Sequence, residues 1–198
     1  MSSDKKNTQE RILDAAWELL EAGQGSGVRM SDIAKTAGIS RQAVYLHFPT
    51  RAELLTATTR HIDAVKNVDE RLAASRNANS GVARLEAFVE AWGNYIPEIH
   101  GVAKALIAMQ DSDEAAQVAW TDRMLAVREG CHSAIKALKG EGVLAPGHTA
   151  KEATDILWTL LSVQSWEQMT QTCGWSQDNY VRTMKTVAKK LLVAEPAE

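Results

Sequence analysis

The sequence predicts an all-α protein in which a three-helix N-terminal domain is followed by a larger helical domain, with about nine helices in all. The main observation is the helical periodicity of the apolar residues. Apolar residues recur at spacings of three and four through residues 12–20, 54–65 and 85–96, which places them on one face of an α-helix. The second observation is that no segment alternates apolar and polar residues as a half-buried strand does.

Capping signals mark where several of these helices begin. Asn7, Thr50 and Thr149 are each followed three residues later by a glutamate, and in that arrangement the cap and the acid satisfy each other's free backbone amides. Glycine and proline supply stops, including Gly38 and Pro97. The predicted helices cover residues 7–23, 30–37, 41–47, 51–75, 81–96, 98–110, 113–139, 149–172 and 177–193.

The predicted domains comprise residues 7–60 and 61–198, and their charges differ. The whole chain has a formal charge of −3, but residues 1–60 carry a net charge of +1 and residues 61–198 a net charge of −4. Because binding of phosphate depends on where the positive charges lie, the acidic remainder does not exclude a nucleic-acid partner for the first domain.

Composition favours a soluble protein of the cytoplasm with no membrane partner. The chain has 198 residues, 45% of them hydrophobic and 24% charged, which is typical of globular domains. It shows neither an apolar run long enough for a membrane span nor a signal-peptide core at its N-terminus. Cys131 and Cys173 lie far apart without metal-ligand spacing. We expect reduced structural thiols, with a disulfide or redox pair as the less favoured alternative.

Residues 30–51 carry the strongest functional signal. Ile33 and Ala34 form an apolar face on one short predicted helix, Val44 and Phe48 form the matching face on the next, and Gly38 marks the turn between them. The side chains left outward on the second helix suit base edges and phosphates. This is the layout of a DNA-binding helix-turn-helix.

The segment from Arg11 to Leu55 resembles the N-terminal domain of TetR-family transcriptional regulators. The resemblance rests on four stretches in this order and spacing: RILDAAWELL, IAKTAGIS, AVYLHF and TRAELL. It implies a homodimer that binds an operator in double-stranded DNA. It also implies a divergent C-terminal domain for ligand binding and dimerisation, and repression that a small molecule relieves.

The predicted DNA contacts centre on the second helix of the motif. Ser40 is expected to cap it, so that its free amides and positive dipole end face the groove. Arg41 suits the two acceptors of guanine and Gln42 suits adenine. The resemblance implies phosphate contacts for Tyr45 and His47, although a packing role for either stays open. The full predicted set is Arg29, Ser40, Arg41, Gln42, Ala43, Tyr45, His47 and Arg51, of which Arg51 stands where the family usually has a lysine.

Tryptophans concentrate in the C-terminal part, where they predict either an ordinary helical core or a ligand pocket. An apolar cavity with a few polar anchors is the usual form of a small-molecule site. The predicted pocket residues are Trp92, Tyr95, Met124, Arg128, Cys131, Trp158, Ser162, Ser165 and Trp166. The chemical class of the ligand cannot be deduced from them.

Apolar stripes on the last two predicted helices indicate a dimer interface. Two such faces from each of two chains can close a four-helix contact, although part of each stripe must also bury into its own subunit. The predicted interface residues are Ile156, Leu160, Val163, Tyr180, Met184, Val187 and Leu191.

These features together predict a sequence-specific repressor that leaves a palindromic operator when a small molecule binds its C-terminal domain. The alternative is a constitutive DNA-binding dimer controlled by a partner protein or by abundance. A small-molecule carrier or enzyme with a vestigial DNA domain is a third possibility. We expect no enzyme activity, since the sequence has no nucleophile elbow, phosphate loop or HExxH motif. We also expect no metal site and no cofactor, because the histidines lie on different segments.

Overall fold

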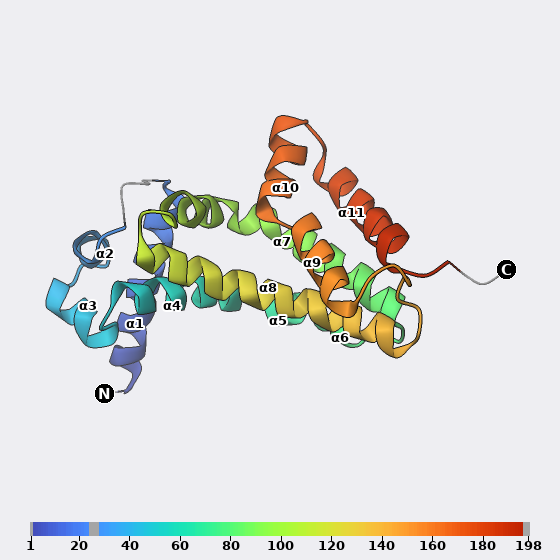
Figure 1. Ribbon diagram of the computed structural model, residues 1–198. Helices are drawn as coiled ribbons and strands as arrows, with labels where there is room; N and C mark the ends of the chain where they lie inside the picture. Colours follow the sequence, from blue (N-terminus) through green and yellow to red (C-terminus); the bar gives the residue numbers. More distant parts are fainter. Residues whose placement is uncertain (1, 24–27, 196–198) are drawn as a thin grey trace. The chain divides into compact units, whose positions relative to one another are not determined.

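The computed structural model describes residues 2–23 and 28–195, with side chains from residue 8 onward, and within these ranges it is helical (Figure 1). The all-α prediction is confirmed. The only β-type pairing among the described residues is an isolated antiparallel bridge between Leu144 and Val193. The helices are α1 (Ser2–Glu21), α2 (Met30–Thr36), α3 (Arg41–His47), α4 (Arg51–Val65), α5 (Val68–Arg71), α6 (Ala73–Arg76), α7 (Gly81–Met109), α8 (Glu114–Gly140), α9 (Ala150–Leu160), α10 (Val163–Glu167), the π-helical turn η1 (Gln168–Thr172) and α11 (Gln177–Leu192).

The chain folds into two compact units that do not follow the predicted boundary at residue 60. The first unit comprises Met1–Asn67 with Ile99–Met124, and the second comprises Val68–Glu98 with Leu125–Glu198. Helices α7 and α8 therefore contribute residues to both units. The functional division at residue 60 stays a prediction, because compact units describe packing and not function.

The predicted helix over residues 51–75 is wrong in its second half. Helix α4 ends at Val65, and Asn67 adopts a positive φ of 54°. Asparagine tolerates this left-handed conformation better than most residues do, so it can end a helix as glycine does. Two single-turn helices, α5 and α6, follow. At the other end of the chain, α1 begins at Ser2 and not at the predicted cap Asn7.

Pro97 does not end a helix, contrary to expectation, and α7 runs through it from Gly81 to Met109. A proline inside a helix has no N–H to donate to the carbonyl four residues earlier, which here belongs to Gly93. That carbonyl instead accepts a hydrogen bond of 2.9 Å from Nε2 of Gln177 on α11. The tertiary contact supplies the missing donor, so the predicted helices 81–96 and 98–110 are one.

The predicted helix over residues 149–172 is divided at Ser162. The predicted cap at Thr149 is present, with the reciprocal contacts to Glu152 that form a capping box. After α9 ends, the Ser162 hydroxyl accepts a hydrogen bond from the amide of Ser165 and starts α10. The Leu161 carbonyl at the division accepts a 2.8 Å bond from Trp92 Nε1. An internal cap and a partner from α7 thus make the interruption favourable.

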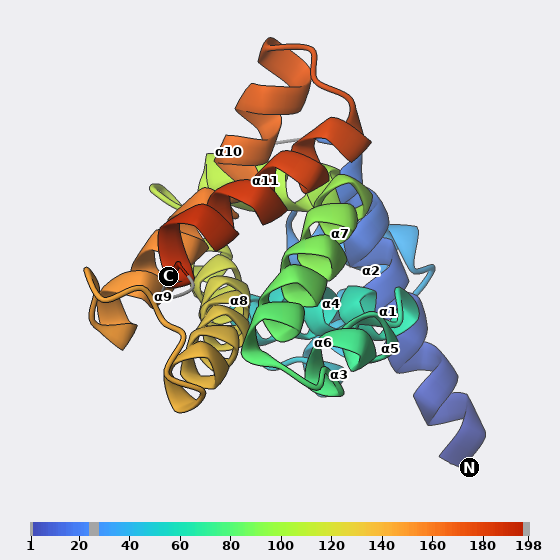
Figure 2. The ribbon, with the colours of Figure 1, turned by 90° about the vertical axis from the view of Figure 1, so that its right-hand side faces the viewer.

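In the second unit, α11 lies across the first half of α7, as Figure 2 shows. The fully buried side chains here include Leu85, Ile135, Leu138, Leu157 and Tyr180. Burial of this apolar surface is the dominant favourable contribution to the packing of these helices.

Replacing Gly130 with alanine is expected to destabilise this unit by about 1–2 kcal/mol net, since overpacking outweighs the gain in helix propensity. A Cβ atom at Gly130 would lie 2.7 Å from Cζ of Phe88 and closer still to its Cε2. The Phe88 ring is buried and cannot move aside freely. Gly140→Ala is the matched control, because no atom lies within 4 Å of the added carbon. Urea unfolding of both variants measures the difference, and equal stability of the two would contradict this packing.

Candidate DNA-binding site

Helices α2 and α3 form the predicted helix-turn-helix. Gly38 takes a positive φ of 66° in the turn, a conformation that glycine adopts without steric cost. Ile33, Ala34, Val44 and Phe48 are all buried, which confirms their assignment to the core of the motif. The limits of α3, Arg41–His47, coincide with those predicted.

Arg11 on α1 fixes the turn from outside the motif. Its Nη2 atom donates a 2.6 Å hydrogen bond to the carbonyl of Ala37. This carbonyl lies at the C-terminus of α2, where helical carbonyls have no partner within the helix. Arg11 lies in the stretch that resembles the family, but its partner Ala37 lies 26 residues away in the chain and has no signal in the sequence.

Ser40 is the N-cap of α3, as predicted. Its hydroxyl accepts a 3.1 Å hydrogen bond from the amide of Ala43. This cap fixes the first turn of α3, where Arg41 and Gln42 are both exposed. Two long polar side chains able to contact base edges therefore project from a rigid helix start.

Arg41 is paired with Tyr45 on the open face of α3. Arg41 Nη2 donates a 3.2 Å hydrogen bond to the Tyr45 hydroxyl, and its guanidinium carbon lies 5.5 Å from the centre of the Tyr45 ring. The hydrogen bond raises the pKa of Arg41 above its already high value. The ring thus gives the exposed guanidinium a cation–π contact before any DNA is bound.

Leu46 is a surface residue of α3 that is absent from the predicted set of DNA contacts. It is 81% exposed, although it is a large apolar side chain. It follows the buried Val44 by two residues, a rotation of about 200° on a helix, and so lies on the opposite face. The same geometry could have identified it from the sequence. Thymine methyl groups are the apolar feature of the major groove that such a side chain can contact.

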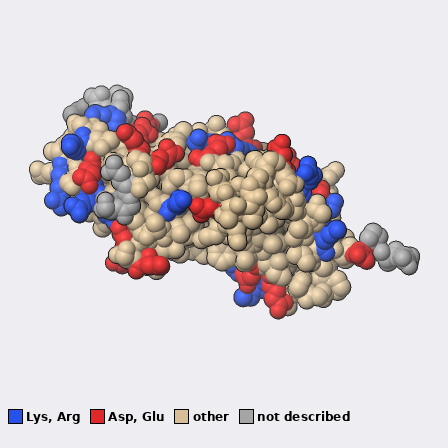
Figure 3. Space-filling view, turned by 90° about the horizontal axis from the view of Figure 1, so that it is seen from above, with Lys and Arg blue, Asp and Glu red and all other residues tan. Residues whose placement is uncertain are grey.

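The remaining predicted DNA contacts occupy different environments. Arg29 is exposed immediately before α2, whereas Ala43 and His47 are half-buried. Lys35 on α2 is exposed as well. Figure 3 shows Lys and Arg side chains gathered over the α2 and α3 segments. This local positive charge agrees with the charge division in the sequence.

Arg51 is placed differently from the other predicted DNA contacts. Its side chain is 21% exposed. Its Nε donates a 2.6 Å hydrogen bond to the Val28 carbonyl, and its Nη1 lies 2.6 Å from both carboxylate oxygens of Asp113. The predicted DNA contact of Arg51 therefore has to compete with partners inside the first unit.

The predicted pocket residues are split between the two units, since Met124 falls in the first and the others in the second. Many of their polar groups have partners within the chain. Arg128 pairs with Asp155 at 2.6 Å, and Trp166 Nε1 donates a 2.9 Å hydrogen bond to Gln177. Trp92 donates to the Leu161 carbonyl, and its ring centre lies 5.9 Å from that of the buried Tyr95. Ser162 and Ser165 form the cap of α10, Cys131 is buried, and Trp158 is half-buried.

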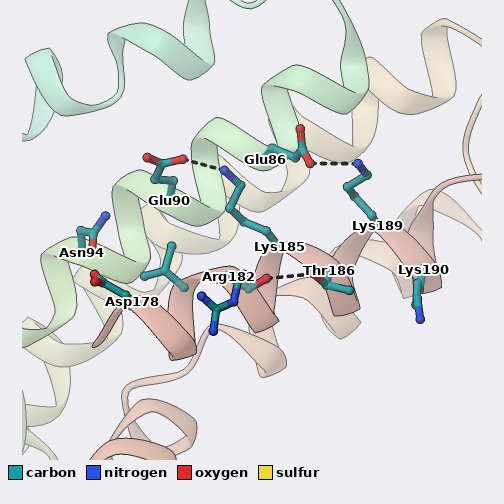
Figure 4. Close-up of a pocket in the computed structure, with 10 residues that line it drawn as sticks. Glu86, Glu90, Asn94, Asp178, Arg182, Lys185, Thr186, Lys189 and Lys190 are labelled. Atoms are coloured by element: carbon teal, nitrogen blue, oxygen red, sulfur yellow. Dashed lines mark hydrogen bonds and ion pairs between the residues drawn. The ribbon is translucent and has the colours of Figure 1, made fainter. Parts of the chain in front are cut away.

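A groove of about 620 Å³ between α7 and α11 contains none of the predicted pocket residues (Figure 4). Its walls are charged: Lys185 pairs with Glu90 at 2.7 Å and Lys189 with Glu86 at 3.0 Å. Val181 is its one apolar lining residue. The two ion pairs that cross it give this groove a structural role in joining α11 to α7.

Three of the predicted dimer-interface residues lie inside their own subunit. Val163, Tyr180 and Met184 are at most 3% exposed, because these side chains pack against the rest of the second unit. The assignment of these three to a dimer surface is therefore corrected. Leu191 is 44% exposed. Ile156, Leu160 and Val187 are half-buried, so this part of the stripe can still meet another chain.

Both cysteines are free. Cys131 is buried, and burial raises the pKa of its thiol to about 12, which keeps it protonated and unreactive at neutral pH. Cys173 is exposed. In the described part of the chain, no three or more His, Cys, Asp or Glu side chains lie close enough to hold a metal ion. No helix within the described ranges is long and apolar enough to cross a membrane.

Comparison with known proteins places the helix-turn-helix in a family. Residues 12–58 match the family described as "Bacterial regulatory proteins, tetR family". The nucleoid occlusion factor SlmA of Marinobacter nauticus is 35% identical over 57 residues, which is 29% of each chain. The alignments with this SlmA and with the SlmA proteins of Marinomonas sp. and Vibrio cholerae span 29–54% of the lengths of those proteins.

Solved structures match over nearly the whole chain. A transcriptional regulator of Saccharomonospora viridis, solved in complex with choline, has a TM-score of 0.74 at 21% identity and covers 96% of this chain and 100% of that one. NalD of Pseudomonas aeruginosa, the secondary repressor of the MexAB-OprM multidrug efflux pump, has a TM-score of 0.69 at 20% identity and covers 98% and 100%. At these identities the likeness shows a shared fold.

Proposed function

Since the chain is a member of the TetR family of bacterial regulatory proteins, identified by its N-terminal domain, we propose that it is a sequence-specific DNA-binding transcriptional regulator. It acts as a homodimer that represses its target genes and leaves the operator when a small molecule binds. The face of α3 carries this proposal. Arg41 and Gln42 project beside a capped helix start, a position from which side chains reach base edges in the major groove.

The proposed contacts divide into two groups. Arg41, Gln42 and Leu46 read bases, with Ala43 close to them in the first turn. Arg29, Tyr45 and His47 hold the phosphate backbone, which positions the protein without carrying sequence information. Tyr45 has a second role, because it also holds the Arg41 guanidinium.

Dimerisation determines the form of the operator. A two-fold dimer sets its recognition helices in successive major grooves, so we expect a palindromic site with half-sites about 34–36 Å apart or somewhat more. The exposed Leu191 with Ile156, Leu160 and Val187 supports an interface on α9 and α11. Such a protein would work in the cytoplasm, where the DNA is.

Selection of bound sequences from random duplex DNA tests the DNA-binding proposal. We expect enrichment of one palindromic motif, since two identical half-sites face the DNA. The same selection at higher salt should yield the same motif with less DNA recovered. Recovery of no motif at any salt concentration would contradict the proposal.

Control by a small molecule has its own support. The hydroxyl of Tyr180 is buried in the second unit and has no hydrogen-bond partner among the described residues. Burial also raises its pKa, which keeps it a neutral donor. An unsatisfied buried hydroxyl is destabilising by about 1–3 kcal/mol, and a ligand that accepted its hydrogen bond would recover this. One structural neighbour, the Saccharomonospora viridis regulator, was solved in complex with choline, so a protein of this fold can hold a small molecule.

Thermal unfolding of the protein without DNA, in the presence of choline or of other small cationic and aromatic compounds, tests control by a small molecule. A true ligand should raise Tm in the wild type, less so in Tyr180→Phe, and should release the selected duplex. A compound that raises Tm and leaves DNA affinity unchanged would contradict ligand control by that compound.

One alternative is a DNA-binding dimer with no small-molecule effector, controlled by a partner protein or by abundance. The relative SlmA is named for nucleoid occlusion and not for a response to a small molecule. The match with this SlmA extends over 57 residues, 29% of the chain, so most of the chain is outside it. The two functions differ in one observable. Under the alternative, no compound changes the affinity for the selected duplex.

A further inference from the structure

The guanidinium of Arg51 lies at the meeting point of three elements of the first unit. Arg51 is the first residue of α4. Its Nε bonds the carbonyl of Val28, which is buried two residues before α2 begins. Its Nη1 contacts both carboxylate oxygens of Asp113, the residue before α8. One side chain therefore joins the entry to the helix-turn-helix, the start of α4 and the start of α8.

Asp113 is itself fixed by a second set of contacts. Its Oδ1 accepts hydrogen bonds from the amides of Ala115 at 3.1 Å and Ala116 at 3.2 Å, and so caps α8. Burial alone would raise the pKa of Asp113, but the bonds from Arg51 and the α8 amides outweigh it and hold the pKa below its usual value. The carboxylate is thus a charged, anchored acceptor for Arg51 at neutral pH.

The placement of Arg51 does not suit a phosphate contact. Nη2, the remaining terminal nitrogen, is buried and has no partner among the described residues. A residue that binds the DNA backbone needs its donors at the surface, as Arg41 has. The Nε and Nη1 donors of Arg51 instead bond groups within the protein.

We propose, on the basis of the DNA-binding function proposed above, that Arg51 and Asp113 are positioning residues that hold the helix-turn-helix for DNA binding and do not themselves contact DNA. The planar guanidinium suits this role because it donates from Nε and Nη1 in fixed directions at once. A lysine ammonium has no such fork. The pair fixes Val28, and with it the start of α2, relative to α8.

A second ion pair between α4 and α8 provides a matched control. Arg60 Nη2 lies 2.6 Å from Asp122 Oδ1, the same distance as in the Arg51 pair. The Arg60 side chain is 62% exposed, and Asp122 keeps a partner in Arg123 when Arg60 is removed. Loss of this pair weakens one α4–α8 contact without touching the segment before α2.

The test compares Asp113→Asn, Arg51→Lys and Arg60→Ala in duplex binding. Asparagine keeps the cap of α8 and removes the charge. Titration uses the duplex recovered by selection, at several salt concentrations. We expect Asp113→Asn and Arg51→Lys to weaken binding by about two- to thirtyfold with the slope of log affinity against log salt unchanged, and Arg60→Ala to bind as the wild type does. If Arg51 bound phosphate, Asp113→Asn would bind equally well or more tightly, and Arg51→Gln would lower the slope by about one phosphate contact.

Hydrogen exchange in the free protein gives a reading that does not depend on DNA. Amides in residues 28–48 should exchange faster in Asp113→Asn and in Arg51→Lys than in the wild type, and at the wild-type rate in Arg60→Ala. If circular dichroism shows that Asp113→Asn does not fold, the exchange rates of Arg51→Lys test the positioning role instead. Unchanged exchange in a folded variant overturns the positioning role. Failure of the wild type to bind any duplex overturns the proposed function. In that case the hydrogen-exchange rates alone test whether Arg51 and Asp113 position the helix-turn-helix.

Discussion

Replacing Phe48 with alanine is expected to lower the free energy of unfolding of the first unit by about 3–5 kcal/mol, the usual effect of removing a buried phenylalanine. Phe48 is 5% exposed, and it ends α3 with its amide bonded to the Val44 carbonyl. A seven-residue helix such as α3 is not stable by itself. Its position depends on this buried contact, so DNA binding should be lost together with stability. Urea unfolding followed by circular dichroism measures the first effect.

Leu46→Ala is the control, because it removes a large apolar side chain from the same helix at an exposed position. We expect its stability to stay within about 0.5 kcal/mol of the wild type. A Phe48→Ala protein as stable as Leu46→Ala would show that α3 is held by other contacts than those described.

Replacing Arg41 with alanine is expected to weaken binding to the selected duplex by about 5- to 150-fold, the range for loss of one bidentate base contact. The loss should depend on sequence. Wild-type protein should discriminate strongly at one base pair of each half-site, and Arg41→Ala should bind all four versions of that pair about equally. Fluorescence anisotropy with the four duplexes measures this.

Arg29→Ala provides the contrast, since a phosphate contact carries no sequence information. This variant should weaken binding to the four duplexes by the same factor and reduce the salt dependence by about one phosphate. If Arg41→Ala behaved in this uniform way, its role as a base reader would be wrong.

Features set by neighbouring residues could be predicted from the sequence. The limits of α3 follow from the Ser40 cap and the apolar spacing of Val44 and Phe48, both of which act within one or two turns. The capping box at Thr149 is equally local. Helix α3 and the cap at Thr149 therefore lie at the residues that the sequence predicts.

Features set by distant partners could not be predicted. Proline is a common stop signal, but α7 continues through Pro97. Gln177, eighty residues later in the sequence, bonds the Gly93 carbonyl that the proline leaves without a donor. The family resemblance implied a DNA contact for Arg51, whereas its partner Asp113 is known only from the fold. Similarly, the stripe of α11 was recognised, but spacing cannot tell whether Tyr180 and Met184 face their own subunit or another.

The most direct test of the central claim, that the α3 face reads duplex DNA, is selection from random duplex DNA carried out in parallel with the wild type and Arg41→Ala. We predict one palindromic motif for the wild type, and for the variant the same motif with the preference lost at a single base pair in each half-site. Identical motifs from the two proteins, or no motif from the wild type, would contradict the claim.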